Sequence, residues 1–365
     1  MAEIIPDQHL AGSIGRVQDL IEGKLLVNGD PVELRLLTDP AKDAASRVLE
    51  MLRINLPCKF WLPNVGQEKA ILPLKSFDGD SHPKIGVFTG GNGTGKTTTL
   101  VNLVAGAAFG VGVMSEFFRD WDIFRKFDEI RKDEHRPIKI RIVCHKTAME
   151  DMGNLYTEIQ KWWPRGKYEW QKNHASYFSA CTCYGEDGRP TALIQVRTFD
   201  QDPRAHAGDT VDLIVVDEPM PQILYSENVG RLRTKRGGLM WFFCTPLEVG
   251  GWMKNQLAND DVGQNSGTIV FTGASIWDNC RDWHPDPAMW VDGRVQRGAT
   301  KDPKKLLTRG HLSKATIDMQ IREWRKESPE IAEAREKGIF INLSGAVFKT
   351  FNPGVHIIEL GVFVL

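Results

Sequence analysis

The 365-residue chain lacks a long hydrophobic run and any appreciable net charge. Its longest apolar stretch, Val101 to Met114, is interrupted by Asn102 and is too short to cross a bilayer. The start of the chain has no basic segment followed by an apolar one, as a secretory signal would. We therefore expect a soluble protein without a membrane partner. Lys and Arg number 46 and Asp and Glu 47, a formal charge of −1, so any contact with nucleic acid must use a local basic patch.

Cysteine shows no framework pattern either. The six cysteines are scattered, at Cys58, Cys144, Cys181, Cys183, Cys244 and Cys280. Cys144 and Cys244 end apolar runs that we interpret as buried strands, where a thiol behaves as a small hydrophobe. Cys181 and Cys183, with His174 nearby, lack a second ligand pair at metal-binding spacing, so we interpret them as reduced structural thiols rather than a metal site. This usage favours a reducing, cytosolic setting.

Apolar, β-branched runs alternate with helical patterns from Trp61 onward. This alternation predicts an α/β fold with a mainly parallel sheet covered by helices on both faces. The expected strands are Ile85–Thr89, Ile138–Cys144, Ala192–Val196, Val211–Val216, Leu239–Cys244 and Thr268–Phe271. The expected helices are Pro40–Leu56, Lys96–Gly110, Lys146–Trp163 and the charge-rich Ser313–Lys337. Residues 1–60, which also contain an alternating segment from Lys24 to Leu37, are predicted to form an N-terminal appendage.

A glycine-rich segment lies between the first of these strands and the helix that starts near Lys96. Its residues are Gly90, Gly91, Asn92, Gly93, Thr94, Gly95, Lys96 and Thr97. They fit the pattern G-x-x-x-x-G-K-[ST] in the strand–loop–helix context that the pattern requires, which a chance glycine turn would not show. Glycines let the backbone N–H groups of the loop point at phosphate oxygens. The positive end of the following helix, whose first turn includes Thr98, also favours phosphate. We predict that Lys96 reaches the β- and γ-phosphates of a nucleoside triphosphate and that Thr97 binds Mg²⁺.

Two carboxylates, Asp217 and Glu218, follow the apolar run Leu213–Val216. Ligands of open α/β sheets bind at the carboxyl ends of the strands, so we predict that Asp217 holds Mg²⁺ through water and that Glu218 activates the attacking water as a general base. Acidic pairs also end many strands at protein surfaces, but a phosphate loop in the same chain favours the catalytic interpretation. A Glu beside the Asp favours a hydrolase over a nucleotide kinase.

Two further segments are weaker signals. Thr245 and Pro246 follow another apolar strand, and a hydroxyl there can sense the γ-phosphate, although Thr-Pro alone is also a common turn. Gln67 precedes the phosphate loop by about one helix, and its amide can read both donor and acceptor atoms on an adenine edge. The alternative for Gln67 is a solvated side chain.

Taken together, these segments resemble the large terminase subunit of tailed bacteriophages, the ATPase motor that packs DNA into proheads. The matching stretches are Trp61–Gln67 (its adenine motif), Gly90–Thr97 (Walker A), Thr198–Pro219 (the segment leading into Walker B), Tyr225–Gly250 (the coupling motif, with Thr245 and Pro246) and Ile321–Ile357 (the entry to its nuclease domain). The stretch Tyr168–Gly188, rich in aromatic residues and cysteine, matches nothing in that family.

The resemblance implies an α/β P-loop NTPase fold of the ASCE type with a mainly parallel central sheet and a small helical C-terminal subdomain. Its domains would be the ATPase core at 61–275, a linker and helical subdomain at 276–340 and the start of a truncated nuclease domain at 341–365. In the family, an RNase-H-like domain with a carboxylate cluster follows. No acidic cluster follows Glu359 here, so we expect no nuclease activity.

The resemblance also implies ligands and partners. The ligands would be ATP and Mg²⁺, and the partners double-stranded DNA, a portal protein, a small terminase subunit and further copies of the chain in a ring. The location would be the cytoplasm of the infected bacterial host. Motors of this kind place an arginine against the γ-phosphate, often from a neighbouring subunit, and the resemblance points to Arg204 as this finger. Arg231, Arg233 and Arg236 are rivals, and they could instead contact DNA phosphates or be solvated surface residues.

Two other interpretations remain open at the level of sequence. A helicase or remodeller of the same ATPase class would bring a second nucleotide-binding-like lobe, but the residues from Asp278 onward show no such alternation. A nucleotide-gated scaffold would bind ATP without appreciable turnover. Glu218 is the residue that separates a scaffold from an enzyme, because a scaffold does not need a base that activates water.

Overall fold

The computed structural model describes residues 26–27, 30–31, 39–75, 84–173, 176–246, 251–291, 294–295 and 310–340. The strands are β1 (Leu26–Val27), β2 (Asp30–Pro31), β3 (Lys84–Gly90), β4 (Ile138–Cys144), β5 (Tyr168–Lys172), β6 (Phe178–Tyr184), β7 (Pro190–Thr198), β8 (Leu213–Asp217), β9 (Leu239–Cys244), β10 (Ile269–Ala274), β11 (Trp290–Val291) and β12 (Arg294–Val295).

The α-helices are α2 (Asp39–Asn55), α3 (Val65–Ile71), α4 (Lys96–Phe109), α5 (Asp122–Asp133), α6 (Asn154–Trp162), α7 (Gln222–Val229), α8 (Gly251–Met253), α9 (Asp261–Asn265), α10 (Lys314–Glu327) and α11 (Pro329–Lys337). Short 3₁₀ turns include η2 (Pro57–Phe60), η3 (Leu72–Leu74), η4 (Val111–Val113), η5 (Glu116–Phe118), η6 (Lys146–Met149), η7 (Pro203–His206), η9 (Ile276–Asn279) and η10 (Pro287–Met289). A π-helical turn, η8 (Lys254–Ala258), continues α8.

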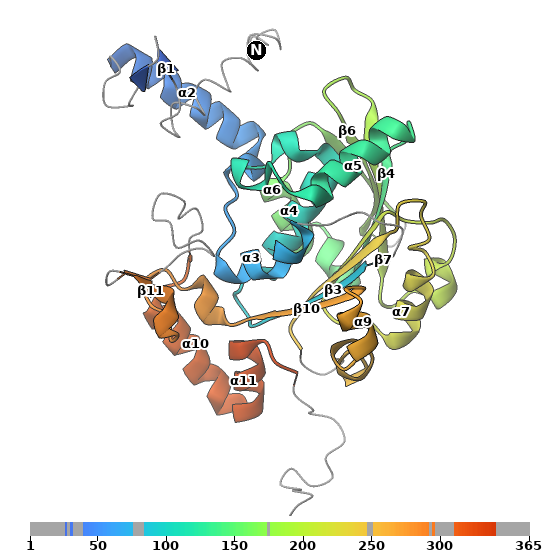
Figure 1. Cartoon of the computed structure of the whole chain (residues 1–365). Helices are drawn as coiled ribbons and strands as arrows, with labels where there is room; N and C mark the ends of the chain where they lie inside the picture. Colours follow the sequence, from blue (N-terminus) through green and yellow to red (C-terminus); the bar gives the residue numbers. More distant parts are fainter. Residues whose placement is uncertain are drawn as a thin grey trace, which may run out of the picture.

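An eight-stranded sheet in the order β10-β3-β9-β8-β4-β7-β6-β5 organises the chain (Figure 1). The first six of these strands are parallel, whereas β6 and β5 extend the sheet in antiparallel fashion. The strand β9 lies between β3, which enters the glycine-rich loop, and β8, which ends at Asp217. A strand between the one that enters the loop and the one that ends at the acidic pair, with Glu218 after β8, is typical of ASCE-type P-loop NTPases. The predicted fold class is therefore confirmed.

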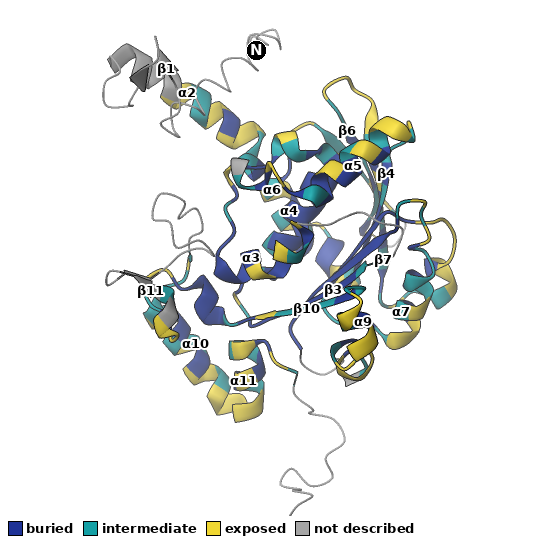
Figure 2. Cartoon of the chain, in the orientation of Figure 1, coloured by how far each residue is buried: buried dark blue, intermediate teal, exposed yellow. Residues whose placement is uncertain are grey.

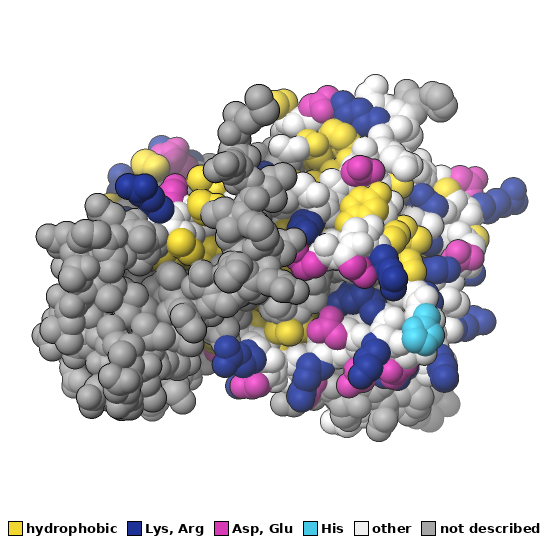
Figure 3. Space-filling model, turned by 90° about the horizontal axis from the view of Figure 1, so that it is seen from above, with side chains coloured by type: hydrophobic (Ala, Val, Ile, Leu, Met, Phe, Trp, Pro, Cys, Tyr) yellow, Lys and Arg dark blue, Asp and Glu magenta, His cyan; other side chains and the backbone are white. Residues whose placement is uncertain are grey.

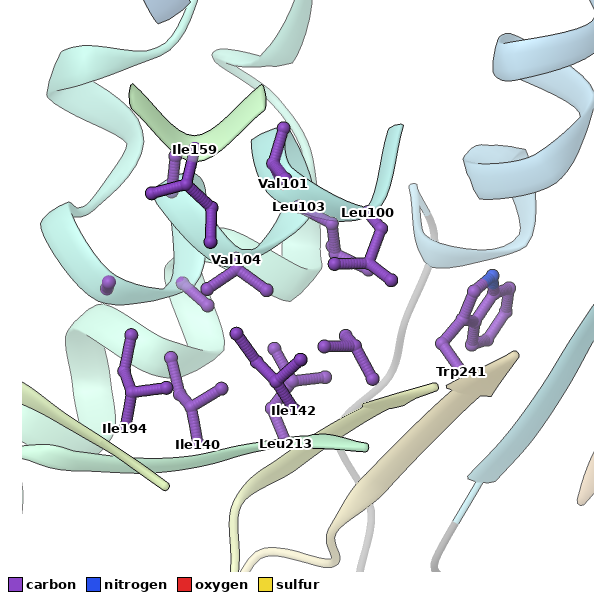
Figure 4. Close-up of a cluster of buried hydrophobic side chains, with 14 of the residues drawn as sticks. Leu100, Val101, Leu103, Val104, Ile140, Ile142, Ile159, Ile194, Leu213 and Trp241 are labelled. Carbon is purple, nitrogen blue, oxygen red and sulfur yellow. The ribbon is translucent and has the colours of Figure 1, made fainter. Parts of the chain in front are cut away.

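Helices cover both faces of the sheet because its strands are apolar on both sides. On one face, Leu100 and Val104 of α4 pack on Ile140, Ile142 and other strand residues (Figure 4). On the other face, α7 and the segment through Leu257 cover a second buried cluster that includes residues of β8 and β9. The strands β3, β4, β8 and β9 and the helix α4 are accordingly among the most buried elements (Figure 2). Among the described residues, no helix is both long and apolar enough to cross a membrane.

Most expected elements are confirmed, with boundaries shifted by a few residues. The predicted helix Lys146–Trp163 is wrong as a single helix: η6 and α6 are separate, since Glu150 and Gly153 adopt extended backbone conformations. Ser313–Lys337 likewise forms two helices, because extended Ser328 caps α11 and Pro329 starts it. The aromatic stretch from Tyr168 forms β5 and β6, which the sequence analysis did not predict.

The helices α10 and α11 form a pair near the glycine-rich loop (Figure 1). A small cluster of buried side chains joins α10 to η9, comprising Ile276, Trp277, Cys280, Ile317 and Ile321. The pair is a feature of the described chain that agrees with a helical subdomain, whereas the domain boundaries themselves stay a prediction. Residues 1–25 and the predicted nuclease start at 341–365 lie outside the described residues.

Candidate nucleotide-binding site

The glycine-rich loop connects β3 to α4 through two left-handed residues. Gly93 and Gly95 have φ of 83° and 87°, a conformation that side chains disfavour. At Gly95 there is no space either, since a Cβ there would lie 2.4 Å from the Gln67 amide nitrogen. Glycine is therefore required at this position for the loop to close onto α3.

The loop and the first turn of α4 present backbone donors to one side. Within the described chain, the N–H groups of Gly95, Lys96 and Thr97 donate to no protein acceptor. Such unpaired donors at a helix start, with the positive end of the helix dipole, make an anion site that suits phosphate. The residues predicted to bind nucleotide, from Gly90 to Thr98, thus lie together, although the Thr98 hydroxyl donates to Glu158 of α6 at 3.0 Å.

Lys96 is buried and folds back over the loop that carries it. Its Nζ donates to the carbonyl oxygens of Gly90 and Gly91 at 3.1 and 3.2 Å. Burial lowers the pKa of Lys96, and the nearby carboxyls of Glu218 and Asp217 act in the opposite direction. To reach a phosphate, the amine has to exchange these two carbonyl contacts for phosphate oxygens.

Asp217 and Glu218 lie where β8 reaches the carboxyl edge of the sheet. Burial, and then the neighbouring Glu218, raise the pKa of Asp217 to about 7, while Lys96 opposes this shift. No donor among the described residues is hydrogen-bonded to the buried Asp217 carboxylate. A carboxylate oxygen without a donor and the Thr97 hydroxyl are ligands that Mg²⁺ prefers, so these residues fit the predicted metal.

Glu218 is the centre of a short chain of hydrogen bonds. Its backbone is left-handed, with φ of 72°, which is unusual for a residue with a side chain. Its carboxylate accepts the backbone N–H of Thr245 at 2.8 Å and faces the Thr245 hydroxyl at 3.5 Å. That hydroxyl donates to Asn92 Oδ1 at 3.2 Å. The predicted general base, the predicted sensor and the phosphate loop are thereby connected, with Pro246 buried beside them.

Gln67 makes a different contact from the one expected. Its side chain is 3% exposed, and both ends of its amide are engaged. The Oε1 accepts the N–H of Asn64 at 3.0 Å and the Nε2 donates to the Gly95 carbonyl at 3.0 Å. These bonds fix the amide against the loop and the start of α3, leaving one N–H of Nε2 and one lone pair of Oε1 for any further contact. The N-x-x-Q spacing of a capping box was the signal in the sequence for this arrangement.

The C-terminal helix pair also contacts the phosphate loop, which the sequence analysis missed. The Asn92 N–H donates to the carbonyl of Arg335, at the end of α11, at 2.8 Å. The next residue after α11, Gly338, is left-handed with φ of 69°. A Cβ on Gly338 would lie 2.9 Å from the Gly90 Cα. No local pattern in the sequence indicates this contact, because the partners are more than 240 positions apart.

The candidate arginines lie in two segments of the chain, one before β8 and one after α7. Arg204 lies in η7, between β7 and β8; it is exposed, and its guanidinium has no hydrogen bond or ion pair within the described chain. The strand β7 is four strand positions from β3, roughly 19 Å at the usual strand spacing. The turn η7 packs against α7, where His206 Nδ1 lies 2.9 Å from Asn228 Nδ2, and no hydrogen bond among the described residues joins Arg204 to the phosphate loop.

Arg231, Arg233 and Arg236 lie between α7 and the start of β9, at the edge of the sheet opposite the phosphate loop. Arg231 donates to the Gly208 carbonyl at 2.8 Å, and Arg236 pairs with Glu129 at 2.9 Å and with Asp133 at 2.5 Å. The seven residues of β3 separate this edge from the phosphate loop, about 20 Å. The structure does not bring these three arginines together with the other predicted site residues.

The structure also describes the six cysteines, which the sequence analysis interpreted as reduced thiols rather than metal ligands. All six cysteines are free and buried, and burial raises the pKa of Cys183 and of Cys144. Within the described residues, no group of three or more His, Cys, Asp and Glu side chains is arranged to hold a metal ion. His174 lies outside the described residues.

Comparison with known proteins shows similarity in fold. No protein-family model matches the chain, and no curated protein matches it. The large terminase of a thermophilic bacteriophage is similar with a TM-score of 0.50 and 14% identity, over 82% of this chain and 58% of that one. The same terminase in complex with ADP has a TM-score of 0.48 and 14% identity, over 81% and 58%. The ATPase domain of the Thermus phage P74-26 large terminase has a TM-score of 0.42 and 14% identity, over 78% and 97%.

The structural neighbours are thus large terminases, and the fold resembles theirs, as the sequence motifs implied. The chain spans less than two thirds of the length of the first of these terminases.

Proposed function

We propose that this chain is the ATP-hydrolysing part of a motor that translocates double-stranded viral DNA into a prohead. The observation that carries the proposal is the convergence of Glu218, Thr245 and Asn92 beside the phosphate loop. A binding module needs the loop alone. A base held next to the metal ligand and tied to a γ-phosphate sensor is the equipment of a hydrolase.

The residues divide the reaction between them. The unpaired N–H groups at the start of α4 bind the phosphates, and Lys96 leaves the loop carbonyls to join them. Thr97 and Asp217 hold Mg²⁺, which supplies positive charge against the phosphate oxygens. Glu218 orients a water for in-line attack and accepts its proton.

The end of the reaction is communicated through Thr245. When the γ-phosphate leaves, the bonds that the Thr245 hydroxyl makes to Asn92 and Glu218 are free to change. Asn92 also donates to the Arg335 carbonyl, so the state of the site reaches the α10–α11 pair directly. An arginine from outside this chain's own site completes the charge stabilisation, and exposed Arg204 suits a contact with the next copy in a homo-oligomeric ring.

Partners and location follow from the motor proposal. They are double-stranded DNA, a portal protein and a small terminase subunit, in the cytoplasm of an infected bacterium. On the face shown in Figure 3, Lys and Arg side chains lie among Asp and Glu side chains. A mixed surface holds a polyanion weakly, which suits a motor that releases DNA at each step. The expected lack of nuclease activity stays a prediction, since residues 341–365 lie outside the described chain.

The test is steady-state ATP hydrolysis with increasing blunt double-stranded DNA. We expect turnover that rises with DNA, is abolished by Lys96→Ala, and is abolished by Glu218→Gln without loss of ATP binding. Turnover of Glu218→Gln at the parental rate would show that another group is the base. ATP binding with no turnover, in the presence of DNA and assembled portal, would favour the nucleotide-gated scaffold.

A further inference from the structure

Three buried amide side chains contact three consecutive carbonyl groups of the phosphate loop. Their exposed fractions are 0% for Asn64, 3% for Gln67 and 6% for Asn279. The donor–acceptor pairs are Asn279 Nδ2 to Gly93 O at 2.6 Å, Asn64 Nδ2 to Thr94 O at 3.2 Å and Gln67 Nε2 to Gly95 O at 3.0 Å. We call these three side chains the amide brace. Two come from the segment that starts α3, and the third comes from η9 after β10.

The brace is itself held in place by hydrogen bonds. Asn64 Nδ2 also donates to Asn279 Oδ1 at 2.8 Å, which links the two distant segments. Asn64 and Gln67 exchange the two bonds of a capping box, and Asn279 Oδ1 accepts the N–H of His311 at 3.0 Å. Both polar atoms of each amide are therefore engaged, so these side chains have little freedom to rotate.

The position of these carbonyls determines where the loop's donors point. In a planar trans peptide, the C=O of one residue and the N–H of the next point in opposite directions. Holding the carbonyls of Gly93, Thr94 and Gly95 against the brace thus turns the N–H groups of Thr94, Gly95 and Lys96 to the other side. Of these, Gly95 and Lys96 donate to no acceptor among the described residues, and Thr94 makes a long turn bond to Gly91 at 3.3 Å.

We propose that Asn64, Gln67 and Asn279 are positioning residues that hold the phosphate loop in its anion-binding conformation before the nucleotide arrives. In this arrangement Gln67 acts on the phosphate end of the ligand and does not read the base. The inference rests on the proposed function, since it takes a nucleoside triphosphate as the ligand. A preorganised donor set binds more tightly because the loop does not have to be ordered on binding.

The test compares two ligands that share phosphates and differ in the base. Dissociation constants for ATP and for inorganic tripolyphosphate are measured by calorimetry on the full chain, with and without each substitution. Gln67→Met keeps the length of the side chain, adds no charge, and removes the donor to Gly95 together with the Oε1 that caps α3. Asn279→Ala removes the donor to Gly93 from a segment 212 positions away in the sequence. Gln264→Ala is the matched control, because its amide donates to the Ala258 carbonyl at 2.6 Å, remote from the loop.

Loss of one neutral hydrogen bond that orders the loop predicts roughly 3- to 10-fold weaker binding. The brace predicts the same factor for ATP and tripolyphosphate, in both variants, with no change in Gln264→Ala. Weaker binding of ATP alone in Gln67→Met, with Asn279→Ala unchanged, would overturn the proposal and assign Gln67 to the adenine. A purely structural role would lower the melting temperature and leave both dissociation constants of the folded protein unchanged, which also overturns it.

A second variant at position 279 and the binding of both ligands to the unsubstituted chain complete the test. If Asn279→Ala fails to fold, Asn279→Ser is measured in its place, since it also lacks the amide that donates to Gly93 and adds no charge, and the same equal loss is expected. Failure of the proposed function is seen separately in the unsubstituted chain, which would then bind ATP without turnover or bind neither ligand.

Discussion

Replacing Arg136 by Met is expected to destabilise the fold strongly, although Arg136 lies far from the nucleotide site. Its guanidinium contacts both carboxylate oxygens of Asp212, at 2.7 and 2.8 Å, and Glu134 at 2.8 Å. Asp212 also accepts the N–H of Lys139 at 2.8 Å. The pair thus joins the starts of β4 and β8, and the Asp212 hydrogen bond raises the pKa of Arg136 above its ordinary value.

The magnitude follows from the burial of the acid. The Asp212 side chain is 1% exposed and that of Arg136 is 29% exposed. Removing one partner of a buried pair leaves an uncompensated charge and costs about 3–5 kcal/mol. Because water reaches Arg136, we expect the lower end, about 3 kcal/mol. For a chain of 365 residues, that corresponds to a melting temperature lower by about 4 °C.

Thermal and urea unfolding at pH 7 provide the assay. The matched control is Arg189→Met, which breaks a pair with Asp187 whose side chains are 86% and 61% exposed and should leave the midpoint unchanged. The double variant Arg136→Met with Asp212→Asn should regain part of the loss, because no charge is then buried alone. If Arg136→Met shifts the midpoint no more than Arg189→Met does, the account of this pair is wrong.

Three further predictions use other parts of the chain. Burial raises the pKa of Cys58 to about 12 and all six thiols are buried, so the native chain at pH 7.5 should react with a thiol reagent only after denaturant is added; rapid labelling of the native chain would contradict this. Gly338→Ala places a Cβ 2.7 Å from the Ala274 carbonyl at a left-handed residue, which should release the α10–α11 pair at a cost of about 1–2 kcal/mol. Faster proteolysis of that pair than in Gly112→Ala, where a Cβ meets nothing within 4 Å, is the expected result, and equal rates would refute it. Burial lowers the pKa of His206 in the folded chain, so on acidification the unfolded chain becomes protonated at His206 before the folded chain does. The contribution of neutral His206 to the free energy of unfolding is therefore fully present above about pH 6.5 and decreases as the pH falls from there towards the pKa of the folded chain. His206→Gln should flatten that part of the melting-temperature profile, and an unchanged slope would show that His206 is not the group responsible.

The fold and the phosphate loop were predictable because their signals are local. A strand, a glycine loop and a helix follow one another from Ile85 to Phe109, so short-range geometry alone brings the loop to the helix start. The same holds for Asp217 and Glu218, which follow an apolar strand directly. The parallel sheet then brings these local pieces to one edge, and Thr245 follows a strand that ends there too.

The contacts of Gln67 and of the arginines could not be predicted from the sequence. An amide near a phosphate loop can serve the base or the loop, and the choice depends on which acceptor lies within hydrogen-bonding distance. The sequence does not contain that distance. Arg204 and Arg231 are 27 positions apart, yet Arg231 donates to the Gly208 carbonyl, only four positions after Arg204, because α7 packs back against η7.

By itself, then, the sequence determined the local elements of this protein: an α/β pattern, a phosphate loop with Lys96 and Thr97, and a carboxylate pair after a buried strand. These depend on residue types and spacings within one strand, turn or helix. Only the tertiary structure decided that Asn279 and Asn64 hold the loop, that α11 ends against Asn92, and that Thr245 bonds to Glu218. Such contacts join residues up to 243 positions apart, and they exist because the order and direction of the strands bring distant segments within hydrogen-bonding distance.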